Sequence, residues 1–204
     1  MTYLLIAALS YLVGSIPFGL IVGRLVGGVD VRSYGSKRTG ATNVLRTMGA
    51  RYGFLVFLLD FGKGVATVGI ARLFTDMDYW AWALAAMMAM IGHIYPIFAG
   101  FKGGRGVATA LGGVLGMFPW AFLAAFIVWW SVVLITRYVS LGSILASIAT
   151  AITTGVFLLF GQSHLAIFLY CVLIAVIVVV SHGDNIARLR AGTESKFGQK
   201  VSVK

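Results

Sequence analysis

The chain alternates long apolar stretches with short polar segments that are rich in glycine, lysine and arginine. An α-helix needs about 20 apolar residues to cross about 30 Å of hydrocarbon. The pattern predicts an all-α integral membrane protein with seven transmembrane helices, at residues 2–26, 52–73, 79–98, 106–118, 120–136, 139–160 and 164–181. The fourth stretch is short, and Pro119 follows it, so a fusion of the fourth and fifth stretches into one helix is the alternative.

The composition supports a membrane protein. Of the 204 residues, 60% are hydrophobic and 11% are charged, and the mean hydropathy is +0.97, whereas soluble domains carry about 25% charged residues. The single cysteine, Cys171, has no disulfide partner and is expected to be a small buried side chain. We expect one polytopic membrane domain over residues 1–204, with residues 193–204 as a flexible cytoplasmic tail.

The basic charges predict the orientation of the chain. The sequence has 16 Lys and Arg against 6 Asp and Glu, but these charges lie between apolar stretches, so we expect membrane lipid and no nucleic acid as partner. With seven helices and the N-terminus outside, all Lys and Arg except Lys63 and Arg72 fall on the cytoplasmic side. Fusing the fourth and fifth helices would export Arg137 and the basic C-terminus, against the positive-inside rule, so seven helices are preferred.

Three polar segments, residues 35–51, 92–109 and 182–194, then share the cytoplasmic face with the turn at residues 137–143. Glycine-rich loops expose backbone NH groups, and Lys, Arg and hydroxyl side chains add charge and hydrogen-bond donors. Proteins hold phosphate groups with this combination. The sequence therefore predicts an anion site at one membrane surface, although an ordinary basic loop would account for the first segment alone.

Within these segments, a helix beginning near Ala41 would place Asn43 and Arg46 on one face, and a helical continuation after residue 181 would do the same for His182 and Asn185. The second segment, Lys102 to Gly106, is similar to a phosphate loop but lacks the GxxxxGK[ST] pattern, so nucleotide hydrolysis is not indicated.

Other charged positions favour structural roles. His93 is expected to be structural, and Asp60 and Lys63 are expected to form an ion pair inside the membrane. The six acidic residues are scattered, which argues against a bound metal, and no GxSxG elbow is present. Small residues between positions 106 and 116 predict a groove for an apolar chain.

Six motifs in order along the chain resemble the bacterial acyl-phosphate:glycerol-3-phosphate acyltransferase family. They are GSIPFG at residues 14–19, GS...GATNVLR at 35–46, DFGKG at 60–64, GHIYPIFAGFKGGRGVAT at 92–109, RYVSLGSI at 137–144 and H..NI.RL..GTE at 182–194. The first segment departs from the usual family pattern, because Lys37, Arg38 and Thr39 occupy this stretch and add two charges. Arg105 stands where lysine is commoner in the family, and Gly183 stands where a basic residue is usual.

The resemblance implies an enzyme of the bacterial inner membrane, with its active site facing the cytoplasm, that works without cofactor or metal and is expected to be monomeric. It would transfer a fatty acyl group from acyl phosphate to the 1-hydroxyl of glycerol 3-phosphate, giving lysophosphatidic acid and phosphate. The implied catalytic residues are Ser36, Arg46, Lys102, Arg105, His182 and Asn185, and the implied substrate-binding residues are Gly40, Thr42, Asn43, Gly103, Gly104 and Ser143.

From these residues we expect charge neutralisation by Arg46, Lys102 and Arg105, and a substrate phosphate oxygen as acceptor of the proton. Two alternatives come from other classes. A transporter of a small phosphorylated solute would also need basic residues and broken helices, and a non-catalytic protein could bind anionic lipid with the same groups.

Overall fold

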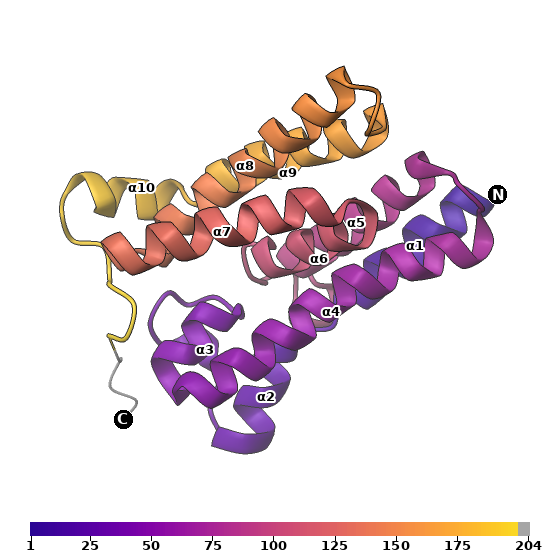
Figure 1. The fold of residues 1–204 in the computed structure, drawn as a ribbon. Coiled ribbons are helices and arrows are strands. Elements are labelled where there is room, and N and C mark those ends of the chain that lie inside the picture. The colour runs from indigo at the N-terminus through magenta and orange to yellow at the C-terminus, as the bar shows by residue number, and fades with distance from the viewer. Residues whose placement is uncertain (200–204) are drawn as a thin grey trace.

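A computed structural model describes residues 1–199 of the chain, and these residues form helices joined by short turns (Figure 1). No strand occurs in the described part. The last five residues of the predicted tail, which include Lys200 and Lys204, lie outside the described part. The helices are α1 (Thr2–Gly14), α2 (Phe18–Gly27), η1 (Val31–Ser33), α3 (Ala41–Met48), α4 (Ala50–Phe74), α5 (Tyr79–Ile94), η2 (Ile97–Ala99), α6 (Val107–Met117), α7 (Pro119–Thr136), α8 (Val139–Leu159), α9 (Leu165–Ser181) and α10 (Gly183–Arg190).

Apolar helices occupy the predicted places, and five stretches of the described chain are long and apolar enough to span a membrane. They are Thr2–Gly27, Ala50–Phe74, Tyr79–Ala99, Pro119–Thr136 and Val139–Leu159. α9 passes the same test together with α10, from which it is bent by 59°, and α6 is a shorter apolar helix. At about 1.5 Å per residue, the 11 residues of α6 cover only about half of the hydrocarbon thickness.

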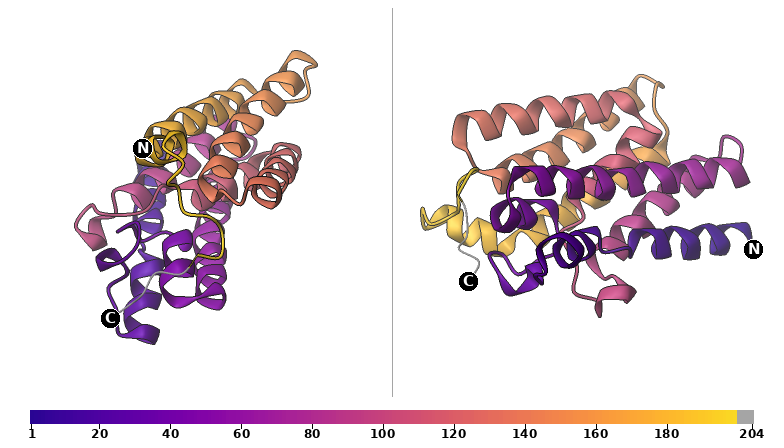
Figure 2. Two further views of the ribbon diagram at one scale, coloured as in Figure 1. Left: turned by 90° about the vertical axis from the view of Figure 1, so that its left-hand side faces the viewer. Right: turned by 90° about the horizontal axis from the view of Figure 1, so that it is seen from below.

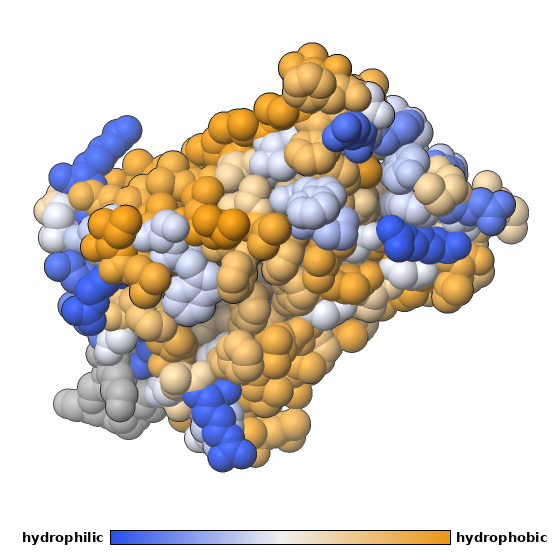
Figure 3. Space-filling model, viewed as in Figure 1, coloured by the Kyte–Doolittle hydropathy of each residue, from blue (hydrophilic) through white to orange (hydrophobic). Residues whose placement is uncertain are grey.

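The hydropathy of the surface follows the division into apolar helices and polar segments. On the face drawn in Figure 3, hydrophobic side chains dominate the middle, and the most hydrophilic residues gather toward the two ends. α3, α10 and the segment after α10 lie at one end, whereas the N-terminus and the turn between α8 and α9 lie at the other (Figures 1 and 2). The first and third polar segments are therefore placed at one end of an apolar bundle.

Close approach of small residues holds the bundle together. α1 packs against α5, where a Cβ at Gly14 would overlap the backbone of Ala89. α4 packs against α6, where a Cβ at Gly112 would overlap the carbonyl of Phe61. A Cβ at Gly113 would likewise overlap the hydroxyl of Tyr170. These glycines bring helices into van der Waals contact, so the groove predicted along residues 106–116 is filled by neighbouring helices at these two positions.

A buried ionic cluster joins the first helices to the second polar segment. Asp60 and Lys63 form the predicted ion pair, with 2.9 Å between Oδ1 and Nζ, and His93 Nδ1 lies 3.3 Å from the same carboxylate oxygen. Lys63 also donates to the carbonyl of Ile16, in the break between α1 and α2. Isolated charges are costly inside a membrane, so this mutual pairing fixes α4 against both the α1–α2 break and the end of α5.

Candidate active site

The first polar segment is a loop folded around one buried amide. Asn43 Oδ1 accepts the backbone NH of Ser36, and Asn43 Nδ2 donates to the carbonyls of Val31 and Arg38. α3 begins at Ala41, as the sequence predicts, with Gly40 as its N-cap residue. The side chain of Asn43, predicted to bind substrate, is thus engaged by the loop in this structure and sets the positions of Ser36 and Arg38.

The second polar segment is a tight turn that rests on His93. The NH groups of Gly103 and Gly104 donate to the carbonyls of Ile94 and His93. A Cβ at Gly104 would clash with the imidazole Nε2 of His93, and one at Gly103 would clash with the His93 carbonyl. The two amides predicted to hold phosphate are therefore already bonded, and these glycines are required for packing.

The third polar segment contains a carboxylate that gathers several elements. Glu194 is buried, and its Oε1 accepts from Asn185 Nδ2 at 2.6 Å and from Ser140 Oγ at 2.8 Å, while Oε2 accepts from Arg188 Nε at 2.7 Å. Burial opposes ionisation, but the hydrogen bonds from Asn185, Arg188 and Ser140 outweigh it and lower the pKa of Glu194 below its ordinary value. Glu194 therefore links α8 to α10.

Two predicted catalytic arginines are attached to the backbone next to this carboxylate. Arg46 of α3 donates to the carbonyl of Ser195 at 3.2 Å, and Arg105 donates through Nε to the carbonyl of Ser181 at 3.0 Å. Burial lowers the pKa of both guanidinium groups, that of Arg105 to about 10, with further contributions from Arg38 and Arg188. These two arginines and Arg188 therefore converge around the buried carboxylate of Glu194.

His182 lies at the bend between α9 and α10, and its side chain is buried. Its Nδ1 lies 2.8 Å from the carbonyl of Val178, which can only accept, so Nδ1 carries the proton in the neutral ring and Nε2 is left as an acceptor. Burial, followed by the charge of Arg105, lowers the pKa of His182 to about 4. The imidazole is therefore neutral at physiological pH.

Asn185 provides a second acceptor at the same bend. Its Nδ2 is bound to Glu194, whereas its buried Oδ1 has no hydrogen-bond partner among the described residues. Buried polar atoms are rarely left unpaired, and an unpaired one is a candidate for ligand binding. His182 Nε2 and Asn185 Oδ1 are thus two acceptors beside a group of arginines.

The remaining predicted residues are placed less directly. Ser143 is buried on α8, and its hydroxyl donates to the carbonyl of Val139. Lys102 is exposed, and no side-chain contact joins it to the other site residues within the described chain. Ser36, in the loop before α3, and Thr42, in the first turn of α3, are half-buried.

Three contributors were absent from the predicted site: Glu194, Arg188 and Arg38. Glu194 and Arg188 belong to the same polar segment as His182, and the spacing of three between His182, Asn185 and Arg188 was a signal for a common helix face. Arg38 acts electrostatically on both Arg105 and His182, and its side chain has no hydrogen bond or ion pair with another described residue. Its proximity depends on the loop around Asn43, which no local pattern specifies.

Comparison with known proteins decides the family. The model of the glycerol-3-phosphate acyltransferase family matches residues 4–192. The chain belongs to this family. Glycerol-3-phosphate acyltransferases from Geobacter sulfurreducens and Aquifex aeolicus are 45% and 41% identical to it, over 95% and 97% of this chain and 97% and 100% of those proteins.

The fold also agrees with solved structures of this family. The crystal structure of PlsY (YgiH), an integral membrane glycerol 3-phosphate acyltransferase, in its glycerol 3-phosphate form superposes with a TM-score of 0.89 at 40% identity, covering 97% of this chain and 96% of that one. Its lysophosphatidic acid form gives a TM-score of 0.86. The present chain is therefore an integral membrane protein with the acyltransferase architecture, as the sequence motifs predict.

Proposed function

We propose that this protein is a glycerol-3-phosphate 1-O-acyltransferase that uses acyl phosphate as its donor and produces lysophosphatidic acid and inorganic phosphate. The observation that carries the proposal is that Arg46 and Arg105, which form no ion pair among the described residues, lie beside two acceptors: Nε2 of the neutral His182 and the buried, unpaired Oδ1 of Asn185. Cations suit the phosphate groups of both substrates, and neutral acceptors suit the hydroxyl groups of glycerol. Family membership supports the same activity.

In the proposed reaction, the 1-hydroxyl oxygen of glycerol 3-phosphate attacks the acyl carbonyl carbon. The bond between that carbon and the phosphate oxygen breaks, and phosphate leaves with the bonding electrons. The hydroxyl proton passes to a phosphate oxygen of the donor. Arg46, Lys102 and Arg105 neutralise the two phosphates, while Ser36 and Thr42 with the start of α3 hold the donor.

His182, Asn185 and Ser143 position glycerol 3-phosphate in this scheme. A neutral His182 that accepts a hydroxyl hydrogen bond orients the nucleophile without having to remove its proton. Proximity of this kind can contribute about 7–11 kcal/mol to lowering a barrier, and the phosphate leaving group reduces the need for a strong base.

We infer further that the chain crosses the inner membrane of a bacterium seven times, with its N-terminus outside and its C-terminus in the cytoplasm. The broken α1–α2 stretch, α4, α5, α6, α7, α8 and α9 supply the crossings. α6 is too short to span alone, so its crossing relies on the turns that flank it. The basic residues around α3 and α10 favour this orientation. We expect the protein to act as a monomer.

The decisive assay is phosphate release by purified protein in detergent. The proposal predicts release only when acyl phosphate and glycerol 3-phosphate are both present, with lysophosphatidic acid as the co-product. Formation of lysophosphatidic acid, measured with acyl-CoA or acyl-carrier-protein thioesters in place of acyl phosphate, tests the donor, because a thioester releases a thiol and no phosphate. Turnover with a thioester but not with acyl phosphate would overturn that part. Transport of glycerol 3-phosphate into proteoliposomes without phosphate release would overturn the enzyme assignment.

A further inference from the structure

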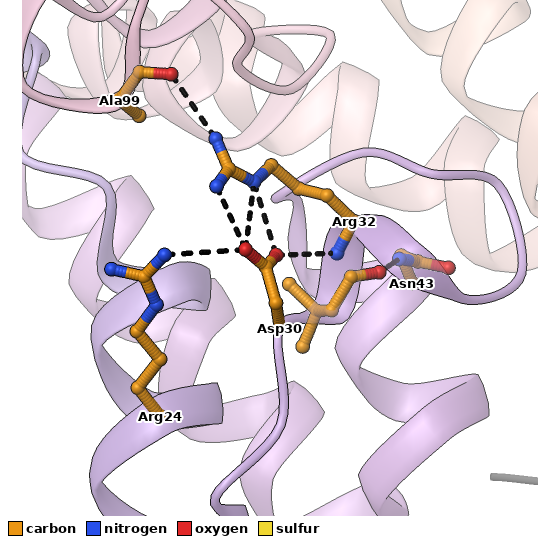
Figure 4. Close-up of polar contacts among 6 residues, drawn as sticks. Arg24, Asp30, Arg32, Asn43 and Ala99 are labelled. Carbon is orange, nitrogen blue, oxygen red and sulfur yellow. Dashed lines mark hydrogen bonds and ion pairs between the residues drawn. The ribbon is translucent and has the colours of Figure 1, made fainter. Parts of the chain in front are cut away.

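Asp30 and Arg32, between α2 and α3, form an ion pair that the proposed chemistry does not use. Asp30 Oδ1 accepts both the backbone NH and the Nε of Arg32 at 3.0 Å, and Oδ2 accepts an η nitrogen of Arg32 at 2.7 Å (Figure 4). A two-point contact between a carboxylate and a guanidinium fixes the plane of the guanidinium. The side chain of Arg32 is only 26% exposed, so it has little freedom to leave this position.

The other η nitrogen of Arg32 crosses to the second polar segment. It donates to the carbonyl of Ala99 at 3.2 Å (Figure 4). The same carbonyl is 3.5 Å from the backbone NH of Lys102. One carbonyl oxygen thus connects Arg32, which precedes the first catalytic segment, to Lys102 in the second.

The turn that carries Lys102 has internal hydrogen bonds, from the NH groups of Ala99 and Phe101 to the carbonyl of Pro96, but its backbone is strained. Gly100 and Phe101 have φ values of +64° and +60°, and this left-handed conformation is unfavourable for a residue with a Cβ, such as Phe101. The Phe101 ring is exposed, so its packing does not hold the turn. Beyond it, Gly103 and Gly104 are fixed to the end of α5. Between Pro96 and Gly103, Arg32 supplies a side-chain hydrogen bond from a distant segment, to the carbonyl of Ala99.

We propose that Arg32, oriented by Asp30, is a positioning residue that holds the Lys102 turn at a set distance from the first polar segment. The inference rests on the proposed function, because Lys102 is placed there among the phosphate-neutralising groups. Loss of this contact lets the turn relax, so that Lys102 is misplaced while its charge is retained. Small displacements of a charge-stabilising group lower turnover strongly.

The chain offers a matched control in Arg24. Its guanidinium also contacts Asp30, at 3.3 Å, but it is 59% exposed and makes no contact with Ala99. Arg24→Ala therefore removes the same charge and one ion pair without touching the turn. Arg32→Lys keeps the charge, but an ammonium cannot bind both carboxylate oxygens in a planar fork and also reach Ala99.

Kinetics of the purified full-length variants with both substrates test the proposal. For Arg32→Ala and Arg32→Lys we expect kcat to fall about 10- to 100-fold, with melting temperatures close to that of Arg24→Ala. The kcat of Asp30→Asn should lie between the values of the two Arg32 variants and that of the wild type. Arg24→Ala should keep wild-type kcat and KM. If Arg32→Lys has wild-type kinetics, or if Arg24→Ala loses as much turnover as Arg32→Ala, the proposal is overturned.

A spin label at Phe101→Cys, in a Cys171→Ala background, separates this proposal from the proposed function. The label should become more mobile when Arg32→Lys is added and stay unchanged with Arg24→Ala. Equal mobility in all three proteins refutes the positioning role even if wild-type turnover is normal. If instead the wild type shows no turnover and the label still responds to Arg32 alone, the acyltransferase proposal fails and the link between Arg32 and the turn stands.

Discussion

Substituting Glu194 tests whether the carboxylate network assembles the proposed site. Glu194→Gln keeps the volume of the side chain but replaces one acceptor oxygen by an NH2 group. If the remaining oxygen still serves Asn185 and Ser140, the new NH2 faces the Nε of Arg188, and a charge-assisted hydrogen bond becomes an opposition of two donors.

The size of the effect follows from these contacts. Hydrogen bonds to charged groups contribute about 1.5–3 kcal/mol, and the value for Arg188 is discounted because that side chain is 40% exposed. We therefore expect Glu194→Gln to cost about 1–2 kcal/mol of unfolding free energy. Glu194→Ala also leaves buried Asn185 and Ser140 without their acceptor, so about 3–5 kcal/mol is expected. These losses correspond to Tm decreases of roughly 2–8 °C and 6–20 °C.

The pH dependence supplies a second measurement. The pKa of Glu194 is lowered in the folded protein, so its stabilising contribution is present above its ordinary pKa of 4.5 and is lost as pH falls through the folded value. The difference in Tm between wild type and Glu194→Gln should therefore be largest near neutral pH and shrink below about pH 4.5.

Thermal unfolding in detergent, with glycerol 3-phosphate kinetics on the same samples, measures both effects. Asp184→Asn is the matched control, because Asp184 is an exposed acid on α10 whose carboxylate accepts no hydrogen bond among the described contacts. Glu194→Gln should also raise KM for glycerol 3-phosphate, since a neutral amide oxygen holds Asn185 more weakly than a carboxylate does and Arg188 loses its acceptor. The reasoning is refuted if Glu194→Gln and Asp184→Asn share the Tm and KM of wild type.

Three further outcomes are expected. His182→Gln should reduce the loss of unfolding free energy between pH 6.5 and 4. In the wild type this loss arises because the pKa of buried His182 is lowered to about 4, so the unfolded chain binds a proton on this histidine at a higher pH than the folded chain does. An unchanged slope in acid-unfolding curves would contradict the assignment. Arg38→Ala should raise KM for acyl phosphate by about 3- to 10-fold, with exposed Lys37→Ala as control, and equal KM values would remove Arg38 from the site. Gly112→Leu should lower expression and Tm through its clash with Phe61; a stable variant with altered chain-length preference would instead restore the groove predicted there.

Periodicity and charge specified much of this molecule in advance. The apolar stretches, the start of α3 at Ala41 and the Asp60–Lys63 pair follow from local rules: helix length in lipid, glycine before a helix and the cost of isolated buried charge. The motifs were sufficient for the family, because six short patterns in one order constrain the whole chain.

The part that sequence did not specify depends on which backbone groups already have partners. Gly103 and Gly104 have the residue types of a phosphate loop, yet their amides are bonded to the end of α5, and the Asn43 side chain is bonded to its own loop. Hydrogen bonds between distant segments decide this, and no spacing rule encodes them.

Hydrogen bonds between distant segments also explain how the polar end of the bundle keeps its geometry. Arg46 donates to the carbonyl of Ser195, after α10, and Arg105 donates to the carbonyl of Ser181, before α10. A guanidinium has five N–H donors, so each arginine retains donors for a phosphate after making this attachment. Arginine thus serves as a structural and an anion-binding group at once, whereas lysine at position 105 would have a flexible point charge in place of an anchored fork. The predicted consequence is that Arg105→Lys keeps the charge but lowers kcat more than it raises KM, and a change confined to KM would show that only charge matters at this position.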